Sequence, residues 1–211
     1  GSTLSDLCAQ IHRLDAQLLD SSVIHAGPNF DVLAASSDSE SDDRIRPDHI
    51  GTLIALAKRS YDCILLDIGR QVHAVCIRAL DHSDLIFPVV QQSLPFIRNG
   101  QRMLDMFSTL GYRKDSIRPI LNRYSEHHAV SAADLERGLG TRIAYQIPNN
   151  FKIASDSINQ GEPVLTMARN SALARSFIKL ARSVTEAQAE TSHSIIRKLF
   201  GRAPLLANLG E

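Results

Sequence analysis

An apolar run that ends in an acid constrains the fold of this chain more than any other feature. The segment Tyr61–Arg70 reads YDCILLDIGR, in which four consecutive apolar residues precede Asp67. A short continuous apolar run predicts a strand that is buried on both faces, as in parallel sheets. Ligands of open α/β sheets bind at the carboxyl ends of the strands. Asp67 is therefore the first candidate binding residue.

Strands and helices are predicted to alternate along the rest of the chain. The predicted strands are Asp84–Val90, Ile117–Leu121 and Arg142–Pro148, and the predicted helices are Phe96–Leu110, a short helix from Ser131 that stops at Gly138 and Gly140, and a final long helix with Leu173, Phe177, Leu180 and Val184 on one side. Parallel strands need crossover connections, which are usually helical, so this order predicts an α/β fold with a doubly wound, mainly parallel sheet. Pro88 cannot donate a ladder hydrogen bond, so a sheet edge or a bulge is expected there.

The N-terminal part is predicted to hold a helix, a strand and a loop. Leucines and isoleucines recur at helical spacing from Leu4 to Leu18, which predicts one amphipathic helix. A short strand is predicted at Phe30–Ala35. Serines and acids crowd the segment Ser36–Asp48, which favours a mobile loop. Pro47 then favours the first turn of a helix that leads into the Asp67 strand.

Size and composition indicate a domain with its own core. The chain has 211 residues, of which 44% are hydrophobic, enough for one large domain or two small ones. We expect one domain over residues 1–184, a polar linker at 185–193 and an amphipathic tail at 194–211. Gly1 and Ser2 are typical of a cloning remnant, so we expect the native chain to begin upstream.

Charge, cysteine content and hydropathy exclude several classes of protein. Lys+Arg 23 and Asp+Glu 23 balance, which removes the attraction expected of a general nucleic-acid binder, so no specific nucleic-acid partner is expected. Cys8, Cys63 and Cys76 are odd in number and lack metal-ligand spacing, which predicts reduced thiols in a cytosolic protein. No apolar run approaches the roughly 20 residues of a membrane span.

No phosphate-binding loop accompanies the Asp67 strand. None of the lysines follows a glycine, so the pattern G-x-x-x-x-G-K-[ST] is absent from the sequence. In proteins that carry this loop, its backbone N–H groups and its lysine supply most of the grip on a polyphosphate. The chain therefore lacks the motif that would hold nucleotide phosphates.

Three roles remain open for Asp67. Gly69 follows it, which lets the backbone turn sharply near a ligand while the carboxylate orients a magnesium-bound water. An aspartate at a strand end also caps a following helix, and the residues fit that role equally well. The pattern further resembles the phosphoacceptor strand of response-regulator receiver domains. Those domains carry a lysine at a later strand end, whereas the later strands here end in Gln91, Asn122 and Pro148.

Polar residues also follow the later strands. Asn122 could place its amide against a purine edge, with the guanidinium of Arg123 stacked on the ring. A turn asparagine beside a solvated arginine explains the same pair. Ile147–Asn150 reads IPNN, which taken alone is an ordinary turn sequence between a strand and a helix. The adjacent His127 and His128 favour a loop over a metal site, so no metal is predicted beyond magnesium.

The C-terminal residues combine an apolar face with cations. The apolar face holds Ile195, Ile196, Leu199 and Phe200, and the cations are Arg197, Lys198 and Arg202. This composition is typical of a short interfacial membrane anchor. A terminal helix that docks on its own sheet or on a partner has the same composition.

Several segments together resemble the ParA/MinD superfamily, and within it the TadZ/CpaE family of Flp-type (tad) pilus assembly proteins. The segments that carry the resemblance are Tyr61–Arg70, His82–Asp84, Gln92–Pro95, Leu121–Tyr124, Ile147–Asn150 and Ile158–Pro163. The combination of Asn-Arg-Tyr, Pro-Asn-Asn and Asn-Gln-Gly-Glu-Pro is specific. The resemblance extends over nearly the whole chain, to about Val184.

The resemblance implies a P-loop NTPase-like switch that binds ATP with magnesium. Residue by residue, Asp67 would hold magnesium through water. Asn122 and Arg123 would form the adenine side, with Pro148 and Asn149 near the base. These assignments come from the family and not from the spacing of the residues.

The resemblance also implies partners and a location. The dimer surface would include Ser93, Leu94 and Pro95, which implies a homodimer. Pilus assembly and secretion proteins would be its partners, commonly at a cell pole. The tail resembles the membrane-targeting tail of MinD-like proteins, which implies a cytoplasmic protein that binds peripherally at the inner membrane.

The chain departs from the family pattern at its start. The phosphate loop, its strand and a following acidic motif would precede residue 1, so the sheet is expected to be incomplete at its N-terminal strand. We expect the chain alone to bind no cofactor and to hydrolyse no ATP, whereas a weak ATPase is expected when the upstream loop is present. The missing strand would leave backbone groups unpaired. The Asp67 strand should therefore pair with the Asp84 strand or with another protein chain.

Overall fold

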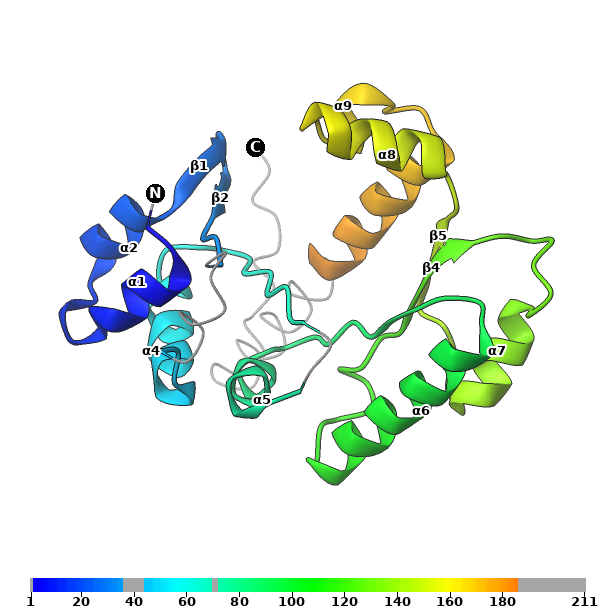
Figure 1. Ribbon diagram of the computed structural model, residues 1–211, viewed down its shortest axis with the longest axis horizontal. Coiled ribbons are helices and arrows are strands. Elements are labelled where there is room, and N and C mark those ends of the chain that lie inside the picture. Colours follow the sequence, from blue (N-terminus) through cyan, green and yellow to red (C-terminus); the bar gives the residue numbers. More distant parts are fainter. Residues whose placement is uncertain (1, 36–43, 70–71, 186–211) are drawn as a thin grey trace, which may run out of the picture. The chain divides into compact units, whose positions relative to one another are not determined.

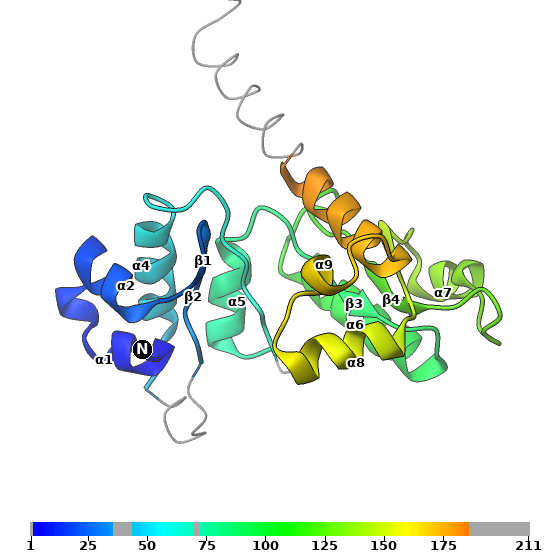
Figure 2. The ribbon, with the colours of Figure 1, turned by 90° about the horizontal axis from the view of Figure 1, so that it is seen from above.

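The computed structural model describes residues 2–35, 44–69 and 72–185, which form two compact units that divide after Asp84 (Figure 1, Figure 2). Each unit is described here by itself. The expectation of a single domain over residues 1–184 stays a prediction. The predicted linker from residue 186 onward and the whole predicted tail lie outside the described residues.

The first unit begins with short helices where the apolar spacing predicted one long helix. Helix α1 spans Leu4–Ala9, a 3-10 turn spans Ile11–Arg13, and α2 spans Ala16–Ser22. Thr3 starts α1 with a capping box, and the Asp15 carboxylate accepts a hydrogen bond from the N–H of Leu18 (2.8 Å) at the start of α2. Each cap satisfies the free N–H groups of a new helix. The prediction of one helix is therefore wrong, because two capping residues divide the segment.

A hairpin and a longer helix follow. Strands β1 (Ile24–Gly27) and β2 (Phe30–Val32) pair in antiparallel fashion, so the strand predicted at Phe30–Ala35 is confirmed only in its first half. Strand β1 was not predicted, because its exposed residues carry no apolar pattern. Residues 36–43 of the predicted loop lie outside the described residues. Helix α4 (Pro47–Ala57) starts at Pro47, as predicted.

A small hydrogen-bonded network ties the hairpin to the end of α4. The His25 ring nitrogen Nδ1 lies 2.7 Å from the Asp31 carboxylate, and the Tyr61 hydroxyl donates to the other oxygen of Asp31 (2.8 Å). The hydrogen bond with Asp31 raises the pKa of His25 above its ordinary value of 6.5. Hydrogen bonds from His25 and Tyr61 lower the pKa of Asp31 below 3.8.

The stability of this unit should therefore depend on pH. A raised histidine pKa stabilises the fold below 6.5, and the gain is lost as the pH rises through the folded-state pKa. A lowered aspartate pKa stabilises it above 3.8, and that gain is lost as the pH falls through the folded-state pKa. We expect Asp31→Asn to lower the unfolding temperature most between these values, and to lower the pKa of His25 in an NMR titration. The exposed Asp62→Asn is the matched control, and equal pH profiles for both variants would contradict the assignment.

The core of the first unit lies between its helices. One cluster joins Leu7 and Leu19 to Leu53 and Ala57 of α4, and a second joins Ile50 and Ile54 of α4 to Ala79 of α5. Helix α5 spans Ala74–Asp81. Cys8 and Cys76 are buried thiols, whereas Cys63 is exposed.

The prediction of a buried strand that ends in Asp67 is wrong. Residues 62–69 have no regular secondary structure, and no backbone hydrogen bond joins them to another described residue. Ile64, Leu66 and Ile68 are half-buried against the helices, whereas Leu65 is 86% exposed and Asp67 is also exposed. This period of two is that of a strand with one covered face. Its pairing with the Asp84 strand or with another chain stays a prediction.

The second unit is built on a parallel sheet. Strands β3 (Val89–Val90), β4 (Ile120–Tyr124) and β5 (Tyr145–Pro148) lie in the order β3-β4-β5. The strand predicted at Asp84–Val90 is reduced to β3 and a single bridge between Ile86 and Ile117. Pro88 offers only its carbonyl oxygen, which accepts the N–H of Ile120 (2.8 Å), and β3 is an edge strand of the described sheet. The edge position predicted for Pro88 is confirmed.

Helices cover both faces of this sheet. The helices are α6 (Leu94–Thr109), α7 (Ala132–Leu139), α8 (Phe151–Gln160), α9 (Val164–Met167) and residues 172–185. Leu121 packs in a cluster with α7, whereas its neighbour Ile120 packs in a cluster with Leu173. Successive residues of a strand point to opposite faces, so the two clusters lie on opposite sides. The Ser131 capping box and the left-handed Gly140 bound α7, as predicted.

Candidate functional site

The structure brings four of the sequence-predicted site residues to one edge of the parallel sheet. Asn122 and Arg123 lie near the carboxyl end of β4, and Pro148 and Asn149 lie at the carboxyl end of the adjacent β5. Arg123 and Asn149 are exposed, whereas Asn122 and Pro148 are half-buried. This edge is where open α/β sheets bind ligands. We refer to these four residues as the strand-end cluster.

A bulge presents the β4 side of the strand-end cluster. Leu121 pairs with Gln146 and Tyr124 pairs with Pro148, so two residues of β4 face only Ile147 of β5. Arg123 has φ of +53°, a left-handed conformation that is uncommon for residues other than glycine. The Asn122 side-chain oxygen accepts the N–H of Arg123 (2.9 Å). That contact leaves the amide NH₂ of Asn122 as a donor for a ligand.

The β5 side of the strand-end cluster is held by backbone contacts. The N–H of Asn149 donates to the carbonyl oxygen of Tyr124 (2.8 Å), which extends the β4–β5 pairing by one residue. The Asn150 side-chain oxygen accepts the N–H of Ile153 (3.1 Å) and so caps α8. Asn150 therefore has a structural role, whereas the exposed carboxamide of Asn149 is available to a ligand.

Gln92 begins one of the segments that resemble the family, but the sequence assigned it no role in this region. Its side chain is buried, with 3% exposure, and forms three hydrogen bonds. Its oxygen accepts the N–H of Ser125 (2.7 Å), and its nitrogen donates to the carbonyl oxygens of Ser125 (3.1 Å) and Val130 (2.8 Å). The sequence does not predict these contacts, because the partners of Gln92 lie far along the chain.

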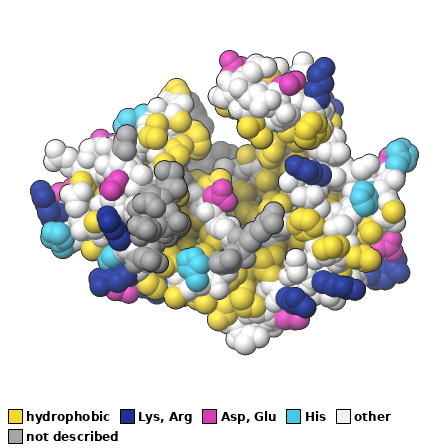
Figure 3. All heavy atoms as spheres, viewed as in Figure 1, with side chains coloured by type: hydrophobic (Ala, Val, Ile, Leu, Met, Phe, Trp, Pro, Cys, Tyr) yellow, Lys and Arg dark blue, Asp and Glu magenta, His cyan; other side chains and the backbone are white. Residues whose placement is uncertain are grey.

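Charge is divided unevenly between the two units. Residues 1–84 hold 7 Lys and Arg against 13 Asp and Glu, whereas residues 85–211 hold 16 Lys and Arg against 10 Asp and Glu. The chain is neutral overall, but residues 85–211 carry a net positive charge. On the face that Figure 3 shows, the basic side chains of the second unit are spread over several elements. Arg123 forms no ion pair with any described residue. Its guanidinium is free to meet an anionic or aromatic ligand.

Asp67 is the one residue of this sequence that is predicted to hold magnesium. Asp67 belongs to the first unit and is exposed, so its place relative to the strand-end cluster stays a prediction. Among the described residues, no group of three or more His, Cys, Asp or Glu could hold a metal ion. A single carboxylate suits magnesium only when phosphates and waters complete its coordination. The residues present therefore fit the base end of a purine nucleotide, and not its triphosphate end.

The predicted dimer surface lies at the start of α6. Ser93 is the N-cap residue, and Leu94 and Pro95 form the first turn. Leu94 is 63% exposed and Pro95 is also exposed, as a contact surface requires. Its use in a dimer stays a prediction.

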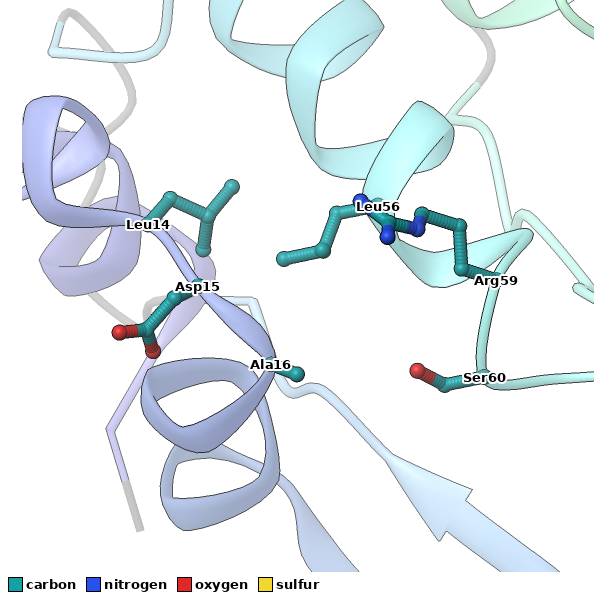
Figure 4. Close-up of a pocket in the computed structure, with 6 residues that line it drawn as sticks. All are labelled: Leu14, Asp15, Ala16, Leu56, Arg59 and Ser60. Carbon is teal, nitrogen blue, oxygen red and sulfur yellow. The ribbon is translucent and has the colours of Figure 1, made fainter.

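A surface hollow of the first unit is lined by none of the predicted site residues. It has a volume of about 490 Å³ and lies between the start of α2 and the end of α4. Figure 4 shows that Leu14 and Leu56 point toward each other across it, whereas the Asp15 carboxylate points away. Asp15 is already used as the α2 cap. The hollow therefore offers few groups that could fix a ligand.

Comparison with curated proteins identifies one relative. The chain is 23% identical over 157 residues to the septum site-determining protein MinD of Thermotoga maritima. The match covers 72% of this chain and 57% of the relative, so the chain spans a little over half the length of that protein. No known family model matches the chain.

Comparison with solved structures identifies the fold. A ParA family ATPase from Chlorobium tepidum matches with a TM-score of 0.81 and 28% identity, over 86% of this chain and 75% of that one. MinD of Pyrococcus horikoshii, solved in complex with Mg-ADP, matches with a TM-score of 0.71 and 21% identity, over 87% and 73%. The MinC:MinD complex of Aquifex aeolicus matches with a TM-score of 0.65 and 20% identity, over 100% and 77%. The predicted α/β fold class with a parallel sheet is confirmed.

Proposed function

We propose that this chain, which has a ParA/MinD-like ATPase fold, is the nucleotide-responsive part of a pilus assembly and localisation factor. It acts through dimerisation and partner contacts in Flp-type (tad) pilus secretion. The observation that carries the proposal is the strand-end cluster, where a free amide, an exposed guanidinium and an exposed carboxamide meet at the ligand-binding edge of the sheet. Its base-binding groups are present, whereas the sequence has no phosphate loop.

Each residue of the strand-end cluster has a distinct role in this proposal. The NH₂ group of Asn122 donates to a ring nitrogen of adenine, and Arg123 stacks on the base. Pro148 and the Asn149 carboxamide border the base on the β5 side. Asp67 holds magnesium through water when phosphates are present. The charge of bound ATP and magnesium controls dimerisation through a surface around Ser93–Pro95.

The alternative function is a weakly hydrolysing ATPase, once a phosphate loop is supplied. The crystallised MinD relative binds Mg-ADP, which favours nucleotide binding in proteins of this fold. The receiver-domain alternative for Asp67 is dropped, because the chain matches ParA/MinD structures over most of its length. The assembly factor is the first choice because the segments that resemble a known family resemble pilus assembly proteins.

Adenosine binding tests the strand-end cluster directly. We expect adenosine to shift the NMR amide signals of Asn122, Arg123 and Asn149, and Asn122→Ala to weaken the binding about tenfold, since one buried hydrogen bond contributes on the order of 1 kcal/mol. The control is Asn99→Ala, which removes an exposed carboxamide from α6. Shifts confined to other residues would contradict the assignment.

The pilus role is tested in the organism. Removal of the gene should abolish surface pili, and a fluorescent fusion should gather at the inner membrane or a cell pole. Normal numbers of pili in the deletion strain would overturn the pilus role and leave the nucleotide site standing.

The C-terminal tail is proposed to bind the membrane surface peripherally. No described helix has the length and apolar character that a membrane crossing needs. The residues that would bind are Ile195, Ile196, Arg197, Lys198, Leu199 and Phe200, all outside the described residues. We expect the protein to sediment with anionic liposomes and to lose this binding when residues 194–211 are deleted. Equal sedimentation of both forms would contradict the anchor.

A further inference from the structure

We infer that Gln92 is a positioning residue that holds the end of β4 in the shape that binds the purine base. The inference rests on the proposed function, because it concerns the strand-end cluster. The Gln92 side chain is buried and forms its hydrogen bonds with backbone groups, so it acts through the segment that it holds.

The Gln92 side chain takes the place of a strand at the end of the sheet. Backbone pairing between β3 and β4 ends at Val90 and Leu121. Farther along, the Gln92 carboxamide accepts the N–H of Ser125 and donates to the carbonyl oxygen of the same residue. These are the two groups that a neighbouring strand would bind. The β4 side of the sheet edge is therefore completed by a side chain.

The same carboxamide also fixes the start of α7. Its second N–H donates to the carbonyl oxygen of Val130 (2.8 Å), directly before the Ser131 cap. One buried group thus joins the ends of β3 and β4 to the start of α7. Both N–H groups of the carboxamide are used. A side chain without these donors would leave the Val130 carbonyl oxygen without this partner and the Ser125 carbonyl oxygen with only the long contact from the N–H of His128 (3.3 Å).

These contacts matter because the bulge of β4 is strained. Arg123 has a positive φ, which costs free energy unless its surroundings impose it. Tyr124 is held from the β5 side by the N–H of Asn149, and Ser125 is held from the opposite side by Gln92. The bulge is therefore fixed directly after Arg123 from both sides. Without Gln92, Asn122 and Arg123 would sample conformations that do not face the base.

Substitution of Gln92 separates positioning from folding. We expect Gln92→Met to weaken adenosine binding about tenfold or more in the NMR titration, at a temperature well below unfolding, because the base-binding groups lose their fixed placement. Gln91→Met is the matched control, since the Gln91 side chain has no hydrogen bond to the described residues. Unchanged adenosine affinity in a folded Gln92→Met variant would overturn the inference.

Gln92→Glu supplies a readout that a purely structural role would not give. The ionised carboxylate accepts from Ser125 but cannot donate to the two carbonyl oxygens, whereas the protonated form regains one donor. We expect its adenosine affinity, relative to the wild-type protein at the same pH, to recover as the pH falls. A ratio that is independent of pH would overturn the positioning role, even if Gln92→Met fails to fold. No adenosine binding by the wild-type protein would instead overturn the proposed function, and this inference with it.

Discussion

Gly100→Val is expected to destabilise the second unit by about 2 to 3 kcal/mol, because the valine side chain is too large for the contact between α6 and α7. A Cβ atom at Gly100 of α6 would lie 2.5 Å from Leu139 Cδ2 and 3.4 Å from Val90 Cγ1. Leu139 cannot move aside freely, because it is 6% exposed and packs in a core cluster with Val90 and Leu121. Valine favours a helix over glycine by less than about 1 kcal/mol, which offsets only part of the clash.

Urea unfolding followed by circular dichroism measures this loss. Asn99→Val is the matched control, since it places the same β-branched side chain on the exposed face of α6. We expect the control to change the free energy of unfolding by less than about 1 kcal/mol. Equal losses for both variants would show that helix propensity, and not the contact with Leu139, sets the effect.

A phosphate loop joined before residue 1 is expected to raise the affinity for ATP by about a hundredfold or more. Several charge-assisted hydrogen bonds to phosphate would form, each contributing roughly 1.5 kcal/mol or more, and each 1.4 kcal/mol changes the affinity tenfold. The strand that leads into such a loop would also find free backbone groups along residues 62–69. The loop can come from the sequence that precedes residue 1 in the gene or from a ParA relative.

Calorimetry with ATP and magnesium measures the affinity, and hydrogen exchange of residues 62–69 reports the strand pairing. A loop whose lysine is replaced by alanine is the control, because it keeps the strand and loses most of the phosphate grip. Turnover by the extended protein would support the ATPase alternative, and binding without turnover would support the assembly factor. Unchanged affinity together with unchanged exchange would contradict the expected completion of the sheet.

Features that depend on near neighbours in the chain were predicted well. The start of α4 at Pro47 and the bounds of α7 at Ser131 and Gly140 follow from capping and backbone preferences within a few residues. The same kind of signal was present at Thr3 and Asp15, where it divides the first helix in two. There the caps override the apolar spacing, which by itself predicts one continuous helix.

Features that depend on distant contacts were missed. The three hydrogen bonds of Gln92 reach partners 33 and 38 positions away, so no local pattern predicts them. The bulge at Asn122 and Arg123 likewise needs the register between β4 and β5. The sequence placed Asn122 and Asn149 at strand ends, but their approach to each other follows from the parallel pairing.

The alternation of strands and helices, the polar residues at the strand ends and the missing phosphate motif are fixed by the order of amino acids, because each depends on local chemistry. Burial depends on the neighbours that a segment finds in space. The run around Leu65 has the composition of a buried strand, yet Leu65 is 86% exposed, since no described strand of the first unit pairs with it. Folding thus decided which apolar residues are covered and which polar residues meet, because both require segments that are remote in the chain to pack together.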